Sequence, residues 1–276
     1  MNSTFLKKIN RRSLLSMPYI IWMIGFIVIP LFMILIYGLS DKSGAFTLEN
    51  ITAIARVGHA KALLLSMLLS LVSTILCLLL AYPLALILRK KKSGFIVFIF
   101  ILPMWMNFLL RTLAWQTLLE KHGVINGILS FLSLPTLKII NTPYAIVFGM
   151  VYNFLPFMVL PIYNVIAKID DSILDAAHDL GASFWQCLFR IIMPLSLPGV
   201  ISGITMVFVP ALTTFVISDL LGGGKILLMG NVIEQEFTKG SNWHLGSGLS
   251  LILMIFILIS MSFIAKYEDA RGEATF

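Results

Sequence analysis

Charged residues are scarce in this sequence, and their scarcity excludes an ordinary water-soluble fold. Asp, Glu, Lys and Arg make up 12% of the 276 residues, whereas hydrophobic residues make up 59%. Soluble domains carry about 25% charged and about 45–50% apolar residues. One soluble core cannot bury so much apolar surface, so the composition predicts that lipid is the solvent for most of the chain.

Cysteine is equally scarce, which argues against a disulfide framework. The sequence has only Cys77 in an apolar run and Cys187 in a stretch of mixed polarity. We expect both to be small packing residues.

Catalytic motifs are also missing. The segment LGGGKILL at 221–228 resembles a phosphate loop, but Lys225 is not followed by Ser or Thr, and Asp219 stands where the first glycine is needed. The segments expected to face the cytoplasm contain no H-E-x-x-H motif, no metal-spaced Cys/His cluster and no Ser-His arrangement. We therefore predict that the chain is not an enzyme and holds no cofactor or metal, and that its energy source is another subunit.

The sequence does contain six apolar runs of about 20 residues, the length of a membrane-spanning helix. The first run follows four basic residues, so a cleaved signal peptide is the alternative; its length and the absence of an A-x-A site favour a retained helix. The pattern predicts an all-α membrane protein with six transmembrane helices in a single transmembrane domain over 1–276, with a core of about 60–265. The runs lie near 18–39 (an extra N-terminal helix), 62–88, 94–119, 143–166, 195–221 and 245–265.

Basic residues set the expected orientation. The tight turn RKKK at 89–92 carries four cations, and such turns face the cytoplasm. An even number of spans places both termini on that same side. The stretch 168–194, between the fourth and fifth runs, is then cytoplasmic as well.

The stretch 168–194 has the signals of two short helices joined by a glycine turn. Asp171 or Ser172 is the expected N-cap of the first helix, and Gly181 is expected to end it in the left-handed conformation. Ser183 and Gln186 form a capping box that begins the second helix. Adjacent Ala176 and Ala177 leave a smooth strip on which another surface could dock, with polar residues around it. An amphipathic loop lying on its own membrane explains the residues equally well.

The spacing of this stretch resembles the EAA motif of ABC-importer permeases, E-A-A-x-x-x-G followed after nine residues by I-x-L-P. Two positions depart from it, since Asp175 replaces the glutamate and Met193 replaces the leucine. In that family the motif forms a coupling helix that docks in a groove of the cytoplasmic ATPase subunit. The resemblance implies this role for Asp175, Ala176, Ala177 and Gly181.

Four segments extend the resemblance over nearly the whole chain, to the B-type permease subunits of spermidine/putrescine importers. It implies the type I ABC importer (MetI-like) permease fold in the bacterial inner membrane. The implied partners are a second homologous permease subunit, two copies of an ABC ATPase that binds ATP and Mg, and a periplasmic or lipid-anchored polyamine-binding protein, with no nucleic acid. Related permeases for putrescine alone, iron or sulfate share the scaffold. The segments are LPMWMNFLLRTLAW (102–115), YNFLPFMVLPIYN (152–164), DAAHDLGAS (175–183) and FVISDLLGGGKILLMGNVIEQEF (215–237).

Asp219 is the one acidic residue inside an expected span, near the outer end of the fifth. A charged side chain costs roughly 2.5 to 3.5 kcal/mol at the bilayer centre, less near an interface, so it should face a partner or a wet cavity. Asp219 is the leading candidate to contact a cationic cargo, and an ion pair with Arg111 is the alternative.

Polyamines carry ammonium groups on methylene chains, so their pathway should offer carboxylates and aromatic faces. Trp105, Asn107, Tyr152 and Phe215 are candidates for its lining, although packing or lipid contact would also explain the aromatic residues. Gly199 and Gly203 permit close helix packing in the fifth span. A self-sufficient secondary transporter is the rival function, but it predicts internal repeats, and none is evident.

Overall fold

The computed structural model describes residues 11–91, 95, 98–99 and 102–272. Within those residues the regular structure is helical, and the only β feature described is an isolated bridge between Ser40 and Phe46. The all-α prediction is therefore confirmed. The chain forms two compact units, which are described separately. Unit 1 comprises Met1–Ala55 and Gln235–Ile255, and unit 2 comprises Arg56–Glu234 and Phe256–Phe276.

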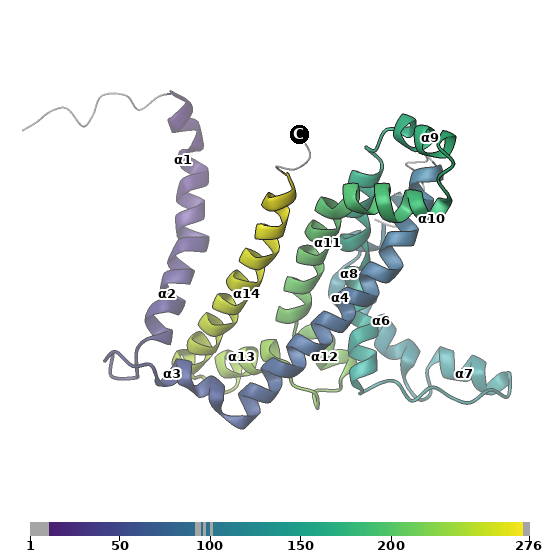
Figure 1. Ribbon diagram of the computed structural model, residues 1–276. Coiled ribbons are helices and arrows are strands. Elements are labelled where there is room, and N and C mark those ends of the chain that lie inside the picture. Colours follow the sequence, from purple (N-terminus) through teal and green to yellow (C-terminus); the bar gives the residue numbers. More distant parts are fainter. Residues whose placement is uncertain (1–10, 92–94, 96–97, 100–101, 273–276) are drawn as a thin grey trace, which may run out of the picture. The chain divides into compact units, whose positions relative to one another are not determined.

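Five helical stretches among the described residues are long and apolar enough to cross a membrane (Figure 1). They coincide with the first, second, fourth, fifth and sixth apolar runs of the sequence. The stretches are Ser16–Gly38, Val57–Lys91, Pro143–Ile166, Phe184–Thr213 and Trp243–Phe263.

The third apolar run does not form one continuous helix. Part of 94–119 lies outside the described residues, and the rest is divided into the 3-10 helix η3 (Leu102–Trp105) and α6 (Phe108–Leu119). Asn107 caps α6 with its Oδ1, which accepts from the backbone N–H groups of Leu109 at 2.9 Å and Leu110 at 3.2 Å. The continuous span was wrong because a side-chain cap starts a new helix there. Helix α7 (Val124–Phe131) follows.

The fifth run also differs from the prediction. Helix α11 (Met193–Thr213) ends before 221, and a separate short helix, α12 (Val216–Leu221), carries Asp219. At the other end, α10 (Phe184–Cys187), the π-helix η4 (Leu188–Ile192) and α11 are consecutive. The second short helix and the fifth span, expected to be separate, form one helical stretch.

The two π-helical segments found among the described residues stand just before a proline. The first, η1 (Ile24–Val28), joins α1 (Arg11–Met23) to α2 (Ile29–Gly38), which has Pro30 in its first turn, and η4 precedes Pro194 in the same way. A proline ring collides with the carbonyl four residues earlier in an α-helix, and a wider turn relieves that collision.

In unit 1, two glycines let the start of α14 (Trp243–Gly272) pack closely on the end of α2 and on α3 (Glu49–Thr52). Of α14, the residues up to Ile255 belong to this unit. A Cβ on Gly38 would lie 2.6 Å from the Leu251 side chain, and one on Gly248 would lie 2.6 Å from Asn50. Side chains at these positions would push the helices apart. The unit also contains η2 (Ala53–Ala55) and the end of α13 (Met229–Thr238).

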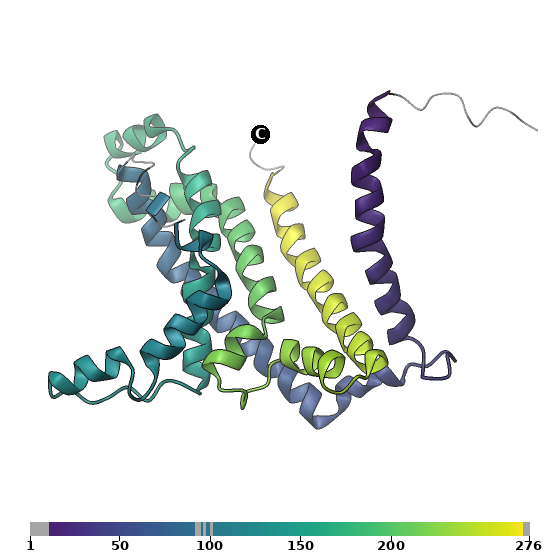
Figure 2. The ribbon, with the colours of Figure 1, turned by 180° about the vertical axis from the view of Figure 1, so that it is seen from behind.

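Unit 2 is built on three helices that pack on one another, α4 (Val57–Lys91), α8 (Pro143–Ile166) and α11 (Figures 1 and 2). A Cβ on Gly199 would lie 2.7 Å from the Pro161 carbonyl oxygen, and one on Gly203 would lie 2.7 Å from the Met158 sulfur. This glycine pair therefore brings α11 close to α8, as its spacing predicted. Helix α9 (Asp171–Asp179) follows α8 and precedes α10.

Candidate functional site

Helix α9 begins with a side-chain cap from Asp170. Its carboxylate accepts a hydrogen bond from the Ser172 backbone N–H at 3.0 Å. The predicted caps, Asp171 and Ser172, were wrong because Ser172 contributes its N–H to the cap and Asp171 lies inside the helix. Hydrogen bonds from Ser172 stabilise the charged carboxylate, so the pKa of Asp170 lies below its ordinary value.

The end of α9 has the geometry that the sequence predicts. Gly181 has a φ of +79°, and the N–H of Ala182 bonds to the Ala177 carbonyl at 2.9 Å, which completes a Schellman turn. Ser183 and Gln186 then form the predicted capping box, with the Ser183 N–H donating to Gln186 Oε1 at 2.8 Å. The helix, glycine turn and helix are confirmed.

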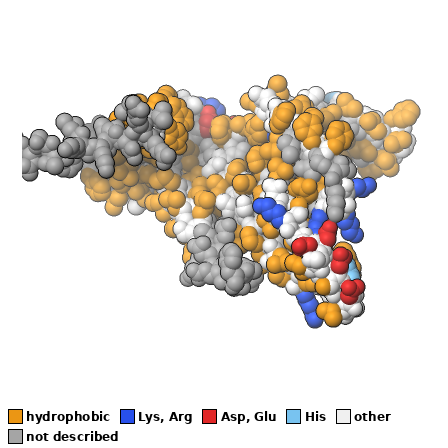
Figure 3. Space-filling model, turned by 90° about the horizontal axis from the view of Figure 1, so that it is seen from above, with side chains coloured by type: hydrophobic (Ala, Val, Ile, Leu, Met, Phe, Trp, Pro, Cys, Tyr) orange, Lys and Arg blue, Asp and Glu red, His pale blue; other side chains and the backbone are white. Residues whose placement is uncertain are grey.

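The candidate coupling residues do not share one surface. Asp175, Ala176 and Gly181 are exposed, whereas Ala177 is only 8% exposed and packs inside the chain. Of the two adjacent alanines expected to form a smooth docking strip, only Ala176 is therefore available to a partner. Next to it Leu180 is 89% exposed, and acidic and basic side chains gather over this end of unit 2 (Figure 3).

Arg89 ties α9 to the end of α4. Its Nη2 donates to the Ile169 carbonyl at 3.0 Å and to the Asp171 carboxylate at 2.9 Å, and the Arg89 side chain is only 14% exposed. The sequence indicated Arg89 only as an orienting charge. Its partners lie 80 and 82 residues away, so no local pattern could reveal the contact.

Asn231 organises the segment that carries Asp219. Its fully buried amide accepts hydrogen bonds from the Ser218 hydroxyl and, at 3.0 Å, from the Leu228 N–H. It donates to the Phe215 carbonyl at 3.1 Å and to the Asp219 carboxylate at 2.8 Å. Asn231 thus stabilises the break between α11 and α12 and holds the exposed Asp219 carboxylate in place.

Arg111 is buried in α6, where it contacts two groups on other segments. Its Nε donates to Asn153 Oδ1 at 2.8 Å, and its Nη1 donates to the Pro103 carbonyl at 2.6 Å. The guanidinium carbon lies 5.7 Å from the centre of the Tyr152 ring, a cation–π distance. The proposed ion pair between Arg111 and Asp219 stays a prediction.

The other candidate pathway residues have different surroundings. Trp105 is 76% exposed and meets Phe98 edge to face, with 5.7 Å between ring centres. Asn107 is exposed, but its side-chain oxygen is used in capping α6. Tyr152 is half-buried against Trp115, and Phe215 is 40% exposed.

These residues form two groups on neighbouring helices. Tyr152 lies with Arg111, and Phe215 lies with Asp219 through Asn231. Helix α12, which carries Asp219, packs against both α6 and α8. The helices that carry the two groups are therefore neighbours in unit 2.

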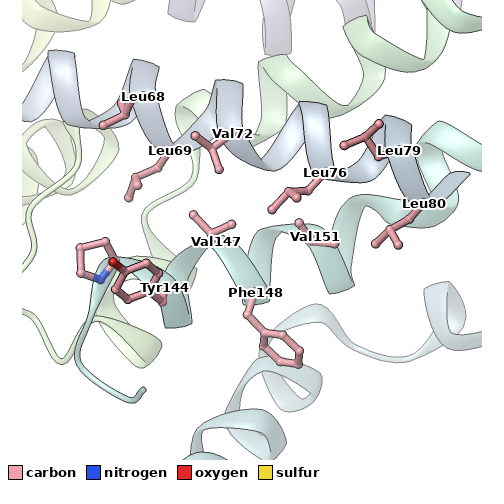
Figure 4. Close-up of a pocket in the computed structure, with 11 residues that line it drawn as sticks. Leu68, Leu69, Val72, Leu76, Leu79, Leu80, Tyr144, Val147, Phe148 and Val151 are labelled. Atoms are coloured by element: carbon pink, nitrogen blue, oxygen red, sulfur yellow. The ribbon is translucent and has the colours of Figure 1, made fainter. Parts of the chain in front are cut away.

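A groove of about 910 Å³ lies between α4 and α8 (Figure 4). Its lining is apolar, unlike the surroundings of Asp219 and Arg111. Its walls are Leu, Val, Pro, Tyr and Phe side chains, with no carboxylate to meet an ammonium group. This groove suits apolar contact and not a cation. Among the described residues, no three His, Cys, Asp or Glu side chains are placed to hold a metal ion.

Comparison with known proteins identifies the family. Residues 4–271 match the binding-protein-dependent transport system inner membrane component family. The chain belongs to this family. It is accordingly a multi-pass inner-membrane permease component.

Curated relatives cover most of the chain. The spermidine/putrescine transport system permease protein PotB of Haemophilus influenzae is 38% identical over 250 residues, which span 86% of this chain and 87% of the relative. PotB of Escherichia coli is also 38% identical, over 85% of this chain and 89% of the relative. The Escherichia coli permease YdcU is 28% identical over 80% of this chain and 75% of its own length.

Solved structures support the fold. A bacterial ABC transporter for alginate import contains a chain with a TM-score of 0.77 and 17% identity, covering 93% of this chain and 95% of its own. The same transporter type, in complex with an alginate pentasaccharide-bound periplasmic protein, gives 0.78 at 17% identity, over 92% of each chain. The ABC importer permease fold is thus shared, while this low identity says nothing about the cargo.

Proposed function

We propose that the chain is the permease subunit of an ATP-driven importer for polyamines, spermidine and/or putrescine. The observation that carries the proposal is the 38% identity to PotB proteins over at least 85% of the chain. The 17% identity to the alginate permeases is far lower, although the fold is the same. An importer for another small cation or a metal is the alternative.

The proposed transporter contains four further subunits or copies. This chain pairs with a second, homologous permease to enclose the pathway, and two cytoplasmic ABC ATPase subunits bind ATP and Mg. A periplasmic or lipid-anchored protein delivers the polyamine. The tight turn predicted at 89–92 was wrong for Arg89, Lys90 and Lys91, which form the last helical turn of α4. These cations are retained on the cytoplasmic side, and with the third run crossing the membrane in its divided form, both termini of the chain face the cytoplasm.

In this proposal Asp219 attracts an ammonium group of the cargo. The carboxylate is exposed yet fixed by Asn231, so it offers a charge that needs little rearrangement to bind. Tyr152 and Phe215 would offer ring faces to a second ammonium group or to methylenes, and Trp105 and Asn107 would line the approach.

Helix α9 would serve as the coupling helix. Its exposed Asp175 and Ala176, with Gly181 in the turn that follows, would face a groove of the ATPase. Buried Ala177 would hold α9 against its own chain. Arg89 would then pass movement of α9 to α4 through its contacts with Ile169 and Asp171. ATP binding closes the ATPase pair, and the paired permeases open the pathway outward.

The test of cargo recognition is Asp219→Asn in reconstituted vesicles that contain all subunits. Asparagine still offers Asn231 an oxygen acceptor, so the fold is preserved while the charge is lost. We expect the KM for labelled spermidine uptake to rise about tenfold, as loss of one partly exposed ion contact of about 1.4 kcal/mol would give.

Asp41→Asn is the matched control, because Asp41 is also a carboxylate that accepts local hydrogen bonds, here from Ser43 and Ala45. Its KM should stay at the wild-type value. Spermidine uptake by the wild-type transporter in the absence of ATP would contradict the importer proposal as a whole. An unchanged KM in Asp219→Asn would show only that Asp219 is not part of the pathway. Competition by unlabelled putrescine then measures the preference between the two polyamines.

A further inference from the structure

A second cavity, of about 350 Å³, lies behind α9. Leu174 and His178, four residues apart on α9, line it, whereas Ala176 is on the opposite side of the helix and is exposed. The cavity therefore leaves the proposed ATPase-facing surface free. Its remaining lining residues are Pro83, Leu86, Ile87, Arg89 and Lys90 of α4, Phe184 and Cys187 of α10, and Ile192 of η4.

The lining combines an apolar floor with cations at one end. The floor is made mainly of aliphatic side chains of α4, α9 and η4, and Arg89 and Lys90 follow one another where α4 ends. The Asp171 carboxylate already pairs with Arg89. The Lys90 ammonium lies 5.7 Å from the centre of the Phe184 ring, a contact that does not neutralise its charge.

The cavity lies where the apolar sequence of α4 gives way to charge. Lys90 and Lys91 are the last residues of this candidate span, directly after the apolar run that ends at Leu88, and cations that flank an apolar run are typical of the headgroup level. Beside the cavity, Phe184, Trp185 and Phe189 are between 52% and 63% exposed, and aromatic residues at a span end are typical of the membrane interface.

We propose that this cavity binds one anionic phospholipid. The phosphate would accept hydrogen bonds from Lys90, and the first methylenes of an acyl chain would pack on Leu86, Ile87 and Ile192. Basic pockets between helices at the headgroup level bind anionic lipids in this way, and about 350 Å³ is at the lower end of ligand-site volumes, roughly 300–1,000 Å³. A free phosphate ion would leave the apolar floor unused.

A lipid in this position would touch the inner side of α9 through Leu174 and His178. Its headgroup would fill the space between α9 and α4, beside the Arg89 contacts. The lipid would thereby set the position from which α9 meets its partner. The binding site itself depends only on this chain and not on the cargo.

The test counts retained lipid on the full-length chain by native mass spectrometry after exchange into vesicles. Vesicles of equal parts phosphatidylglycerol and phosphatidylethanolamine should leave one phosphatidylglycerol on the wild-type chain. Lys90→Gln should lower that retention about fivefold, the effect of one cation near the surface. Lys91→Gln is the matched control, because Lys91 is the next cation and is exposed but does not line the cavity, and it should retain wild-type amounts.

A second variant keeps every charge. Ile87→Trp would fill the floor at a position that is already 56% exposed, and it should lower retention as Lys90→Gln does. Equal loss in Lys90→Gln and Lys91→Gln, equal retention of phosphatidylcholine, or displacement of the lipid by millimolar inorganic phosphate would each overturn the proposal. None of these outcomes depends on spermidine uptake, so failure here is distinct from failure of the proposed function.

Discussion

The turn between α9 and α10 and the turn between α12 and α13 both interrupt helices, but they are stabilised by different kinds of hydrogen bond. At the first, the exposed Ser183 cap bonds to Gln186 three residues away, and the Ala182 N–H bonds to the Ala177 carbonyl five residues back. At the second, buried Asn231 bonds to Phe215 and Asp219, 16 and 12 residues away. The first turn depends only on hydrogen bonds between residues close in sequence and is exposed to a partner. The second depends on long-range hydrogen bonds of a buried side chain, which fix the position of the Asp219 carboxylate.

The largest effect should come from Asn231→Leu, which removes the centre of the buried turn. The Leu228 N–H would lose its partner while fully buried, and a stranded buried polar group costs about 1–3 kcal/mol. The Ser218 hydroxyl would keep the Phe215 carbonyl as its acceptor, 3.0 Å away. We expect a loss of about 2 kcal/mol, seen as a lower thermal unfolding midpoint of the purified chain.

Asn164→Leu serves as the control for that experiment. Asn164 is an exposed asparagine of α8, so its replacement should change the midpoint little. Equal midpoints for the two variants would show that the α12–α13 turn does not depend on Asn231.

Gly181→Ala should have a smaller, local effect at the α9–α10 turn. The space beside Gly181 is open, but its φ of +79° costs an L-residue roughly 1–2 kcal/mol, partly offset by a less flexible unfolded chain. We expect a net loss of about 1 kcal/mol, measured as faster hydrogen exchange at the Ala182 amide.

The matched control is Gly58→Ala. Gly58 lies in α4 with open space around it and no positive φ, so alanine there should leave stability unchanged or raise it. If both variants exchange at the wild-type rate, the left-handed turn is not a constraint on α9.

The smallest expected effect is the pH dependence of the stabilisation that the Asp170 cap gives to α9. Because the folded pKa of Asp170 is below the ordinary 3.8, its stabilisation of α9 is present above that value and is lost as the pH falls through the folded pKa. Asp170→Asn keeps the oxygen acceptor but does not titrate. The difference in α9 hydrogen exchange between wild type and Asp170→Asn should therefore change between about pH 5 and about pH 3, and a pH-independent difference would contradict the cap.

The sequence predicted the features that depend on neighbouring residues. Five apolar runs form helices long and apolar enough to span a membrane, as their length and composition predicted. Gly181 ends α9 and the Ser183–Gln186 box caps α10, because both features depend only on residues close in sequence. The cap of α9 was misplaced by one residue within a run of Asp and Ser. Such errors are small because the competing caps are adjacent.

Long-range contacts account for what the sequence did not reveal. The break after Thr213 depends on Asn231, and the attachment of α9 to α4 depends on Arg89, whose partners are 80 or more residues distant. The burial of Ala177 likewise follows from packing, so two adjacent alanines that look alike in sequence have opposite surroundings. No periodicity or motif encodes these pairings.

The most direct measurement of the central claim is uptake of spermidine per ATP hydrolysed by the assembled transporter carrying Ala176→Trp. A bulky side chain on the exposed face of α9 should block docking and lower this ratio at least about tenfold, the equivalent of 1.4 kcal/mol, with an unchanged unfolding midpoint. Phe189→Trp, which also places a tryptophan at an exposed position but outside α9, should keep the wild-type ratio. A wild-type ratio in Ala176→Trp would contradict the coupling role of α9.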